Sequence, residues 1–278
     1  MDKAAICALA QAARTDLEKK AHLCLQALRG PRLPGGTGLR QDQLLHLVSR
    51  RGEDTVCRKA ACRYFMELAG IRYMEVNGCL PQRVLSPAAG NELPQILESW
   101  LSTHADTLDR DEIYTRLFRR ECARLHQLVP DFFPKPDCTD LLLSLSYRHG
   151  AAALFRDSLP EDAWKDQIEI IGWLYQYYHL QEKNAAIDVY RGAVKMRDVP
   201  AATQFFTTDW VVKYMVQNTL GRVWLEGHPD SRLRTKMPYF LDTPQKATRS
   251  PMNPEDLHLL DPCMGSGHIL VYAFDLLL

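Results

Sequence analysis

The sequence predicts a mainly α N-terminal helical domain followed by the beginning of an α/β domain. Two observations predict this order. Apolar residues recur every three or four positions through the first ~200 residues, without alternation or internal repeats. The last stretch, LHLLDPCMGSGHILVYAFDLLL (257–278), reads as a short buried strand, a glycine loop and an apolar helix. We therefore expect a helical domain over residues 1–199 and the start of a second domain over residues 200–278.

Composition limits the classes of protein to which the chain can belong. The 278 residues carry 34 basic and 34 acidic side chains, so the net charge is zero. A protein devoted entirely to gripping DNA is usually more basic. The eight cysteines form no CxxC pair or zinc-spaced cluster, so we expect reduced thiols and no metal site. No stretch has the length and apolarity of a signal peptide or a membrane span, and we expect a cytoplasmic protein without membrane contact.

The first predicted helix covers residues 2–29 and is stopped by the glycine- and proline-rich stretch GPRLPGGTG. Its apolar stripe consists of Ile6, Leu9, Ala13, Leu17, Ala21, Leu25 and Leu28. The same segment carries the basic residues Arg14, Lys19, Lys20, Arg29, Arg32 and Arg40. Contact of these residues with DNA is one interpretation, and a solvated helix face and loop is the favoured one.

Further helices are expected over residues 54–76, 94–104 and 111–128, the first of them ended by Asn77-Gly78 as a left-handed cap. The segment from Leu159 to Tyr178 predicts another helix, which begins at Leu159-Pro160-Glu161-Asp162. Its aromatic residues could form a stacking platform for bases, but their spacing of three and four favours core packing. The scattered histidines His104, His126 and His149 are interpreted as ordinary surface or core residues.

The character of the chain changes at PAATQFFTTDWVVKYMVQNTLG (200–221). An extended aromatic piece leads into a helix for which Thr207 or Thr208 is the N-cap, and Gly221 closes that helix. Residues 226–256 are rich in proline, threonine, serine and charge, and we expect a long, partly mobile connection there.

The glycine loop carries the strongest functional indication. Gly265 and Gly267 allow a sharp turn, so the amides around Ser266–His268 can point, with the helix dipole, at a carboxylate or phosphate. A phosphate-binding P-loop needs Lys and Ser or Thr after its last glycine, and a dinucleotide fingerprint needs a third glycine; neither is present. Asp261 suits a cationic amine beside a carboxylate, as in the methionine part of S-adenosylmethionine. An ordinary strand–helix turn is the alternative.

These residues resemble a known family. FFTTDWVVKYMVQNTLGRVWLE, a spacer and LLDPCMGSGHILVYAFDLL look like the adenine-specific DNA methyltransferases of bacteriophage-exclusion (BREX) systems, the PglX type. IRYMEVNGCLP (71–81) and IEIIGWLYQYY (168–178) resemble the helical N-terminal region of that family, and the likeness is closest after about residue 160. The resemblance implies a Rossmann-like, S-adenosylmethionine-dependent domain that methylates the exocyclic amine of adenine in double-stranded DNA, in phage defence.

By position, the resemblance places two cofactor motifs at residues 204–221 and 257–270. The implied cofactor-binding residues are Phe206, Thr207, Asp261, Pro262, Gly265, Ser266 and Gly267. Thr208 departs from the family, which usually has proline there. Its hydroxyl can still cap the helix, although local rigidity is lower.

The family's Asn-Pro-Pro-aromatic loop, which holds the flipped-out adenine, is absent. The only Asn-Pro is Asn253-Pro254, which has the wrong neighbours and precedes the cofactor motif, so no catalytic residue is assigned. We expect an N-terminal fragment or truncated product of such a methyltransferase, inactive alone, whose strand at 257–260 lacks parallel neighbours.

Two other classes stay open. The helical region could be an interaction module that docks other BREX defence proteins or contacts DNA without catalysis. The glycine loop could instead serve a different nucleotide-dependent enzyme.

Overall fold

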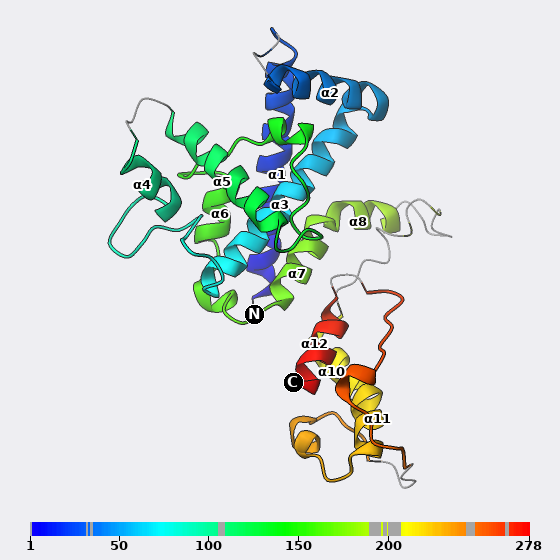
Figure 1. Cartoon of the computed structure of the whole chain (residues 1–278). Helices are drawn as coiled ribbons and strands as arrows, with labels where there is room; N and C mark the ends of the chain where they lie inside the picture. Colours follow the sequence, from blue (N-terminus) through cyan, green and yellow to red (C-terminus); the bar gives the residue numbers. More distant parts are fainter. Residues whose placement is uncertain are drawn as a thin grey trace. The chain divides into compact units, whose positions relative to one another are not determined.

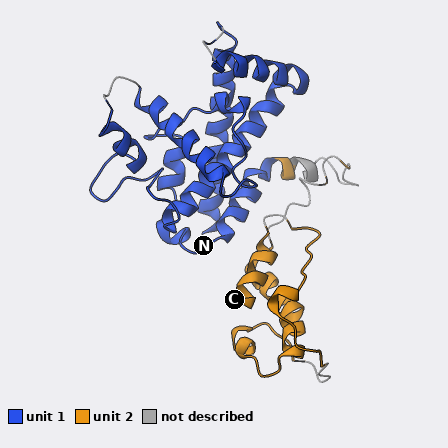
Figure 2. Cartoon of the chain, viewed as in Figure 1, with its two compact units in different colours: residues 1–181 blue, residues 182–278 orange. Residues whose placement is uncertain are grey.

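The computed structural model divides into two compact units, residues 1–181 and 182–278 (Figure 2), and each is described here by itself. The structure describes residues 2–31, 33, 36–104, 109–188, 196, 199, 207–242, 248–264 and 267–278. The expected boundary between residues 199 and 200 stays a prediction, because residue 200 lies outside the described residues. No helix in the described ranges combines the length and the apolar character that crossing a membrane requires.

The N-terminal unit is a helical assembly, as the apolar spacing predicts (Figure 1). Its α-helices are α1 (Lys3–Leu28), α2 (Gly36–Arg51), α3 (Glu53–Val76), α4 (Gln95–Leu101), α5 (Arg110–His126), α6 (Ala151–Asp157) and α7 (Glu169–Tyr178), with 3-10 helices η1 (Cys138–Leu142) and η2 (Glu161–Ala163). Helix α1 packs against α3, α6 and α7, and so forms the centre of the core. The described part of this unit has no strand, only an isolated bridge between Pro87 and Pro94.

Helix α1 follows the predicted pattern closely. The side chain of Asp2 caps its amino end by accepting hydrogen bonds from the amides of Ala4 and Ala5. The predicted stripe is buried from Ile6 to Leu25, whereas Leu28 is half-buried. At its inner face the side chains of Gln11 and Arg14 donate hydrogen bonds to the backbone carbonyls of Tyr177 and Tyr178, which lie at the carboxyl end of α7. These bonds satisfy carbonyls that the helix leaves unpaired.

The aromatic residues of the segment 159–178 contribute to the core, as their spacing favours. Trp164 is fully buried and Tyr178 nearly so, and the rings of Phe65 and Tyr178 lie 4.7 Å apart. Phe65 also meets Phe155 edge-on at 5.1 Å. This burial removes these rings from any surface on which a base could stack.

The single helix expected from Leu159 to Tyr178 is wrong. The segment contains η2, a turn and then α7, and Asp166 between them has a left-handed φ of 54°. The cause is Asn77, which was expected only as a cap. Its side chain donates to the carbonyl of Trp164 at 3.1 Å and accepts from the amide of Asp166 at 2.8 Å, which stabilises the turn.

The sequence reasoning also missed α2 and α6. Helix α2 begins inside the glycine-rich stretch that was interpreted only as a stop, and Gln41 holds it in place. The Gln41 side chain is 2% exposed, donates to the carbonyl of Leu28 at 2.7 Å and accepts from the amide of Leu33 at 2.8 Å. Gln41 thereby links the start of α2 to the last residue of α1.

The C-terminal unit is built around α10 (Asp209–Asn218), α11 (Leu220–Gly227) and α12 (His268–Leu277). Helix α8 (Leu180–Asp188) crosses the division between the units, and η4 (Arg232–Lys236) and η5 (Pro254–Asp256) are short 3-10 turns. Its core consists of Val212, Val216, Leu220, Met237, Ala273 and Leu276. Gln217 is fully buried in this unit, donating to the Tyr272 hydroxyl at 2.7 Å and accepting from the Tyr239 amide at 2.7 Å.

Two expectations for this unit are corrected. The strand at 257–260 is absent and Leu260 is 85% exposed, because no described segment pairs with it, so the Rossmann-like beginning is not formed among the described residues. The helix after residue 208 ends at Asn218, and Gly221 lies inside α11. Met237, which lies within the connection expected over residues 226–256, is fully buried against Gly221, where a Cβ would meet its Sδ at 2.5 Å. The partial mobility expected for that connection stays a prediction.

Candidate cofactor site

The candidate site lies where the amino ends of α10 and α12 meet within the C-terminal unit. Nδ1 of His268, the first residue of α12, lies 3.2 Å from the backbone carbonyl oxygen of Thr207, two residues before α10. Sixty-one residues separate the two in the sequence. The fold thus brings together the two motifs that the resemblance implied, although their role in cofactor binding stays a prediction.

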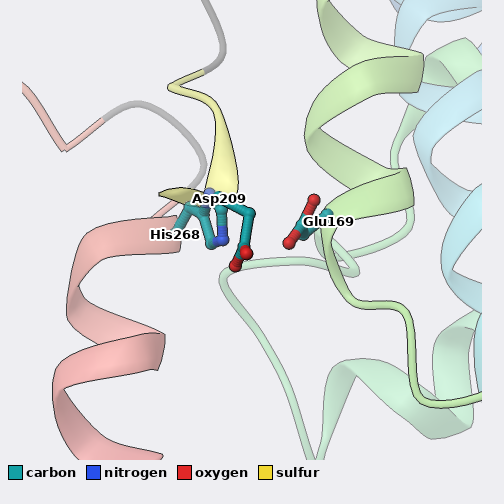
Figure 3. Close-up of side chains that lie close together, drawn as sticks. All are labelled: Glu169, Asp209 and His268. Atoms are coloured by element: carbon teal, nitrogen blue, oxygen red, sulfur yellow. The ribbon is translucent and has the colours of Figure 1, made fainter. Parts of the chain in front are cut away.

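Asp209 completes this arrangement at the first position of α10. Figure 3 shows its carboxylate next to the imidazole of His268, and a ligand atom of each lies within 4.8 Å of the other. The Asp209 carboxylate also forms an ion pair with Nζ of Lys213 at 2.7 Å. Glu169, which Figure 3 also labels, belongs to α7 of the N-terminal unit. The expectation that the chain holds no metal stays a prediction.

Helix α10 begins where the sequence predicted, but without the expected capping hydrogen bond. Thr208 is the N-cap, with an extended backbone at φ −66° and ψ 145°, yet its side chain makes no capping hydrogen bond. The acidic Asp209 follows in the first turn, where it interacts favourably with the positive end of the helix dipole. The charge of Asp209, rather than the Thr208 hydroxyl, therefore stabilises this helix start.

The glycine loop ends in the conformation that its sequence predicts. Gly267 is the N-cap of α12 and adopts the left-handed region, with φ 78° and ψ 11°, and its amide donates to the carbonyl of Met264 at 2.8 Å. No side chain caps the helix. A Cβ placed on Gly267 would meet only Cγ of Met264, at 3.9 Å, so the loop is open on the side that a ligand would need.

Asp261 provides the clearest test of whether this loop fits S-adenosylmethionine. Its Oδ1 accepts a hydrogen bond from the amide of Cys263 at 2.9 Å, which folds the start of the loop. Its Oδ2 is buried and has no hydrogen-bond partner among the residues that the structure describes. A buried carboxylate oxygen without a donor is costly, and the cationic amine of a methionyl group is a donor of the required kind. The chemistry of Asp261 therefore fits the cofactor, and its role in binding stays a prediction.

The other implied cofactor residues are placed as follows. Pro262 is exposed in the turn between Asp261 and Cys263. Phe206, Gly265 and Ser266 lie outside the described residues. The sequence reasoning missed the side chain of His268 as part of the arrangement, because it considered only the backbone amides around Ser266–His268. Its position at the start of the predicted helix was the available indication.

The comparisons with known proteins place this chain beside adenine-specific methyltransferases. No protein-family model matches it. Among curated proteins it is similar to the adenine-specific methyltransferase BrxX of Escherichia coli O9:H4 (strain HS), at 35% identity over 274 residues, which cover 88% of this chain and 22% of that protein. It is also similar to the adenine-specific methyltransferase PglX of Lacticaseibacillus casei (strain Zhang), at 35% identity over 263 residues, 79% of this chain and 22% of the relative.

Both relatives are adenine-specific methyltransferases by name, and the resemblance to the BREX methyltransferases of the PglX type is therefore confirmed. The chain spans about a fifth of the length of these curated relatives.

Proposed function

We propose that this chain forms part of a site-specific adenine DNA methyltransferase of a BREX phage-defence system. The observation that carries the proposal is the 35% identity to BrxX over 88% of the chain, which extends through both units. The substrate of the complete enzyme is double-stranded DNA and its cofactor is S-adenosylmethionine. Other BREX proteins are its proposed partners and the cytoplasm its proposed location.

When bound, S-adenosylmethionine supplies a methyl group that moves from its sulfonium sulfur to the exocyclic nitrogen of adenine; the C–S bond breaks, a C–N bond forms and the amine gives up a proton. The proposed role of this chain's residues is to bind and orient the cofactor. Oδ2 of Asp261 would accept a hydrogen bond from the methionyl amine, and the amides at the amino end of α12 would hold the carboxylate. Thr207 and His268, which contact each other beside this helix end, would help to keep the donor in one position.

We propose that binding is the whole contribution of this chain and that it does not methylate DNA alone. Transfer also requires oxygen acceptors that hold the adenine amine in line with the methyl group and stabilise its developing positive charge. Trp210 and Tyr214 on α10 are exposed, but aromatic faces stack on bases and supply no such acceptors. These acceptors are expected from an Asn-Pro-Pro-aromatic loop, which the 278 residues lack.

The test is incubation of this chain, and of a longer chain that adds an Asn-Pro-Pro-aromatic loop and a recognition domain, with labelled S-adenosylmethionine and plasmid DNA. Nucleoside analysis should find methyladenine only with the longer chain, at one defined sequence. A longer chain with Asp261→Asn is the matched variant and should lose activity, since the amide removes the acceptor charge. Methyladenine from the 278-residue chain would disprove the assignment of roles, and methylcytosine from the longer chain would disprove the proposed reaction.

The self-contained core of the N-terminal unit favours one further candidate, a helical module that binds defence proteins or DNA without catalysis. A longer chain that is folded, binds DNA and yields no methylated base would favour this candidate over the methyltransferase.

A further inference from the structure

The basic residues that the sequence offered as DNA contacts are mostly engaged within the N-terminal unit. Arg14 is 5% exposed and donates to the carbonyl of Tyr178 at 2.6 Å. Lys20, Arg29 and Arg40 form ion pairs with Asp16, Glu53 and Asp140 at 3.1, 2.6 and 2.7 Å. Arg32 lies outside the described residues. Lys19 is exposed and takes part in none of these contacts, so the described part of this set offers one unpaired cation rather than a cluster.

Four exposed cations are concentrated instead where α2 ends and α3 begins: Arg50, Arg51, Arg58 and Lys59. We call them the corner cations. None of them forms an ion pair with any residue in the described ranges. Glu53 and Asp54 at the start of α3 contact other residues: Glu53 forms an ion pair with Arg29 at 2.6 Å, and Oδ1 of Asp54 lies 3.2 Å from Nε2 of His22.

The backbone keeps the corner cations close together. Arg51 is the last residue of α2, Gly52 alone makes the turn with φ 82°, and Glu53 is the first residue of α3 (Figure 1). The amide of Gly52 donates to the carbonyl of Val48 at 2.9 Å, which fixes the angle at which α2 ends. At a rise of about 1.5 Å per residue, Arg58 and Lys59 lie only about 8 Å along α3 from this turn.

Helix stability explains only half of this arrangement. Arg50 and Arg51 lie in the last turn of α2, where the helix dipole favours cations. Arg58 and Lys59 lie near the amino end of α3, which favours acidic residues, as Glu53 and Asp54 illustrate. Because the net charge of the chain is zero, the corner cations reflect segregation of charge rather than a basic composition.

We propose that the corner cations bind the phosphate backbone of double-stranded DNA. This proposal rests on the proposed function and adds to it a contact surface in the helical unit, remote in sequence from the cofactor loop. Arginine and lysine side chains on exposed helix ends contact phosphate oxygens without reading bases. The surface would hold and orient the duplex and leave sequence recognition to other parts of the enzyme. Its binding should depend steeply on salt, since neutralising each phosphate releases counterions.

The test is fluorescence anisotropy of a labelled 20-base-pair duplex titrated with the 278-residue chain at several salt concentrations. The variant replaces the corner cations as Arg50→Gln, Arg51→Gln, Arg58→Gln and Lys59→Gln. The matched control carries Arg83→Gln, Arg116→Gln, Lys165→Gln and Arg249→Gln, four cations whose side chains are 42%, 62%, 54% and 54% exposed and which each pair with a carboxylate. Both variants lose four positive charges, and circular dichroism checks that both are folded.

At 0.1 M salt the corner variant should bind at least tenfold more weakly. The negative slope of log K against log salt should become shallower by about 3 to 4, or ~0.9 for each phosphate that is no longer neutralised. The control should stay within threefold of the unchanged chain. Equal weakening of both variants would mean that only net charge matters and would overturn the proposal. So would an unchanged chain that fails to bind duplex DNA but binds vesicles of anionic phospholipid.

Failure of this proposal is distinguishable from failure of the proposed function. If a longer chain methylates adenine equally well with and without the corner cations, the function stands and the corner surface does not. If the corner variant loses duplex binding but none of the longer chains produces methyladenine, the surface stands and the methyltransferase assignment does not.

Discussion

Glu75, near the carboxyl end of α3, is the side chain on which the stability of the N-terminal unit should depend most visibly. Its side chain is 0% exposed. Oε2 accepts hydrogen bonds from the amides of Val84 and Leu85, both at 2.7 Å, and Oε1 accepts from Nη1 of Arg72 at 3.0 Å. One buried carboxylate therefore satisfies both a loop backbone and a buried guanidinium.

The change Glu75→Gln keeps the size of the side chain but replaces one acceptor oxygen with an amide donor. The new NH2 group faces either the amides of Val84 and Leu85 or the guanidinium of Arg72, which are all donors. In both orientations Arg72 loses its buried negatively charged partner. Removing one member of a buried ion pair costs about 3–5 kcal/mol. Glu161 remains 3.7 Å from Nη1 of Arg72 and is half-exposed, so we expect a value near the lower limit. At about 2–4 °C per kcal/mol for a unit of this size, the midpoint should fall by roughly 6–12 °C.

The assay is thermal and urea unfolding followed by the helical circular dichroism signal. The control is Glu112→Gln, which removes the partner of Arg116 in an exposed pair, where the side chains are 53% and 62% exposed and the loss should be below about 1 kcal/mol. A Glu75→Gln chain whose stability matches that of the control would refute the reasoning that this carboxylate holds the loop.

The other predictions concern the glycine loop and a buried thiol. In the complete enzyme Gly267→Val should abolish S-adenosylmethionine binding measured by calorimetry, because the new side chain strains a left-handed residue and fills the open side of the loop. The control Gly90→Val, at a residue of the other unit with φ 85°, should leave binding unchanged. Equal effects of the two changes would contradict this prediction. Burial raises the pKa of the Cys57 thiol from 9.0 to about 11, so its neutral form stabilises the fold below pH 9 and that contribution disappears as the pH rises towards 11. Urea unfolding should show this decline, and Cys57→Ala should reduce it; an equal decline in both chains would exclude Cys57 as the cause.

The sequence predicts helices well where their pattern is local. Helices α1 and α3 have a continuous apolar stripe and clear ends, and both lie within two residues of the predicted limits. The break before α7 depends on Asn77, whose side chain bonds to Asp166, 89 residues further along the chain. No periodicity within the segment 159–178 reports such a contact, and the apolar spacing alone therefore favoured a single helix.

In the candidate site, too, local features could be predicted from the sequence, and contacts between distant residues could not. The left-handed Gly267 follows from local chemistry, since glycine adopts that conformation at little cost. The contact of His268 with Thr207 requires the chain to return across 61 residues, and no pattern within either motif specifies it. The strand expected at 257–260 also depends on distant residues. Leu259 and Leu260 remain exposed because no described neighbour offers the hydrogen bonds that a strand requires.

The central position of α1 has a consequence for how the protein is made. Its inner face is completed by α7, with Gln11 and Arg14 bonded to the carbonyls of Tyr177 and Tyr178. The first helix of this chain to leave the ribosome therefore cannot finish docking until α7 has also emerged. At about 5–20 residues per second, translation of the intervening ~160 residues takes roughly 8 to 30 s. Throughout that interval the apolar stripe of α1 is only partly covered, so a nascent chain arrested before Tyr178 should be a preferred client of ribosome-associated chaperones.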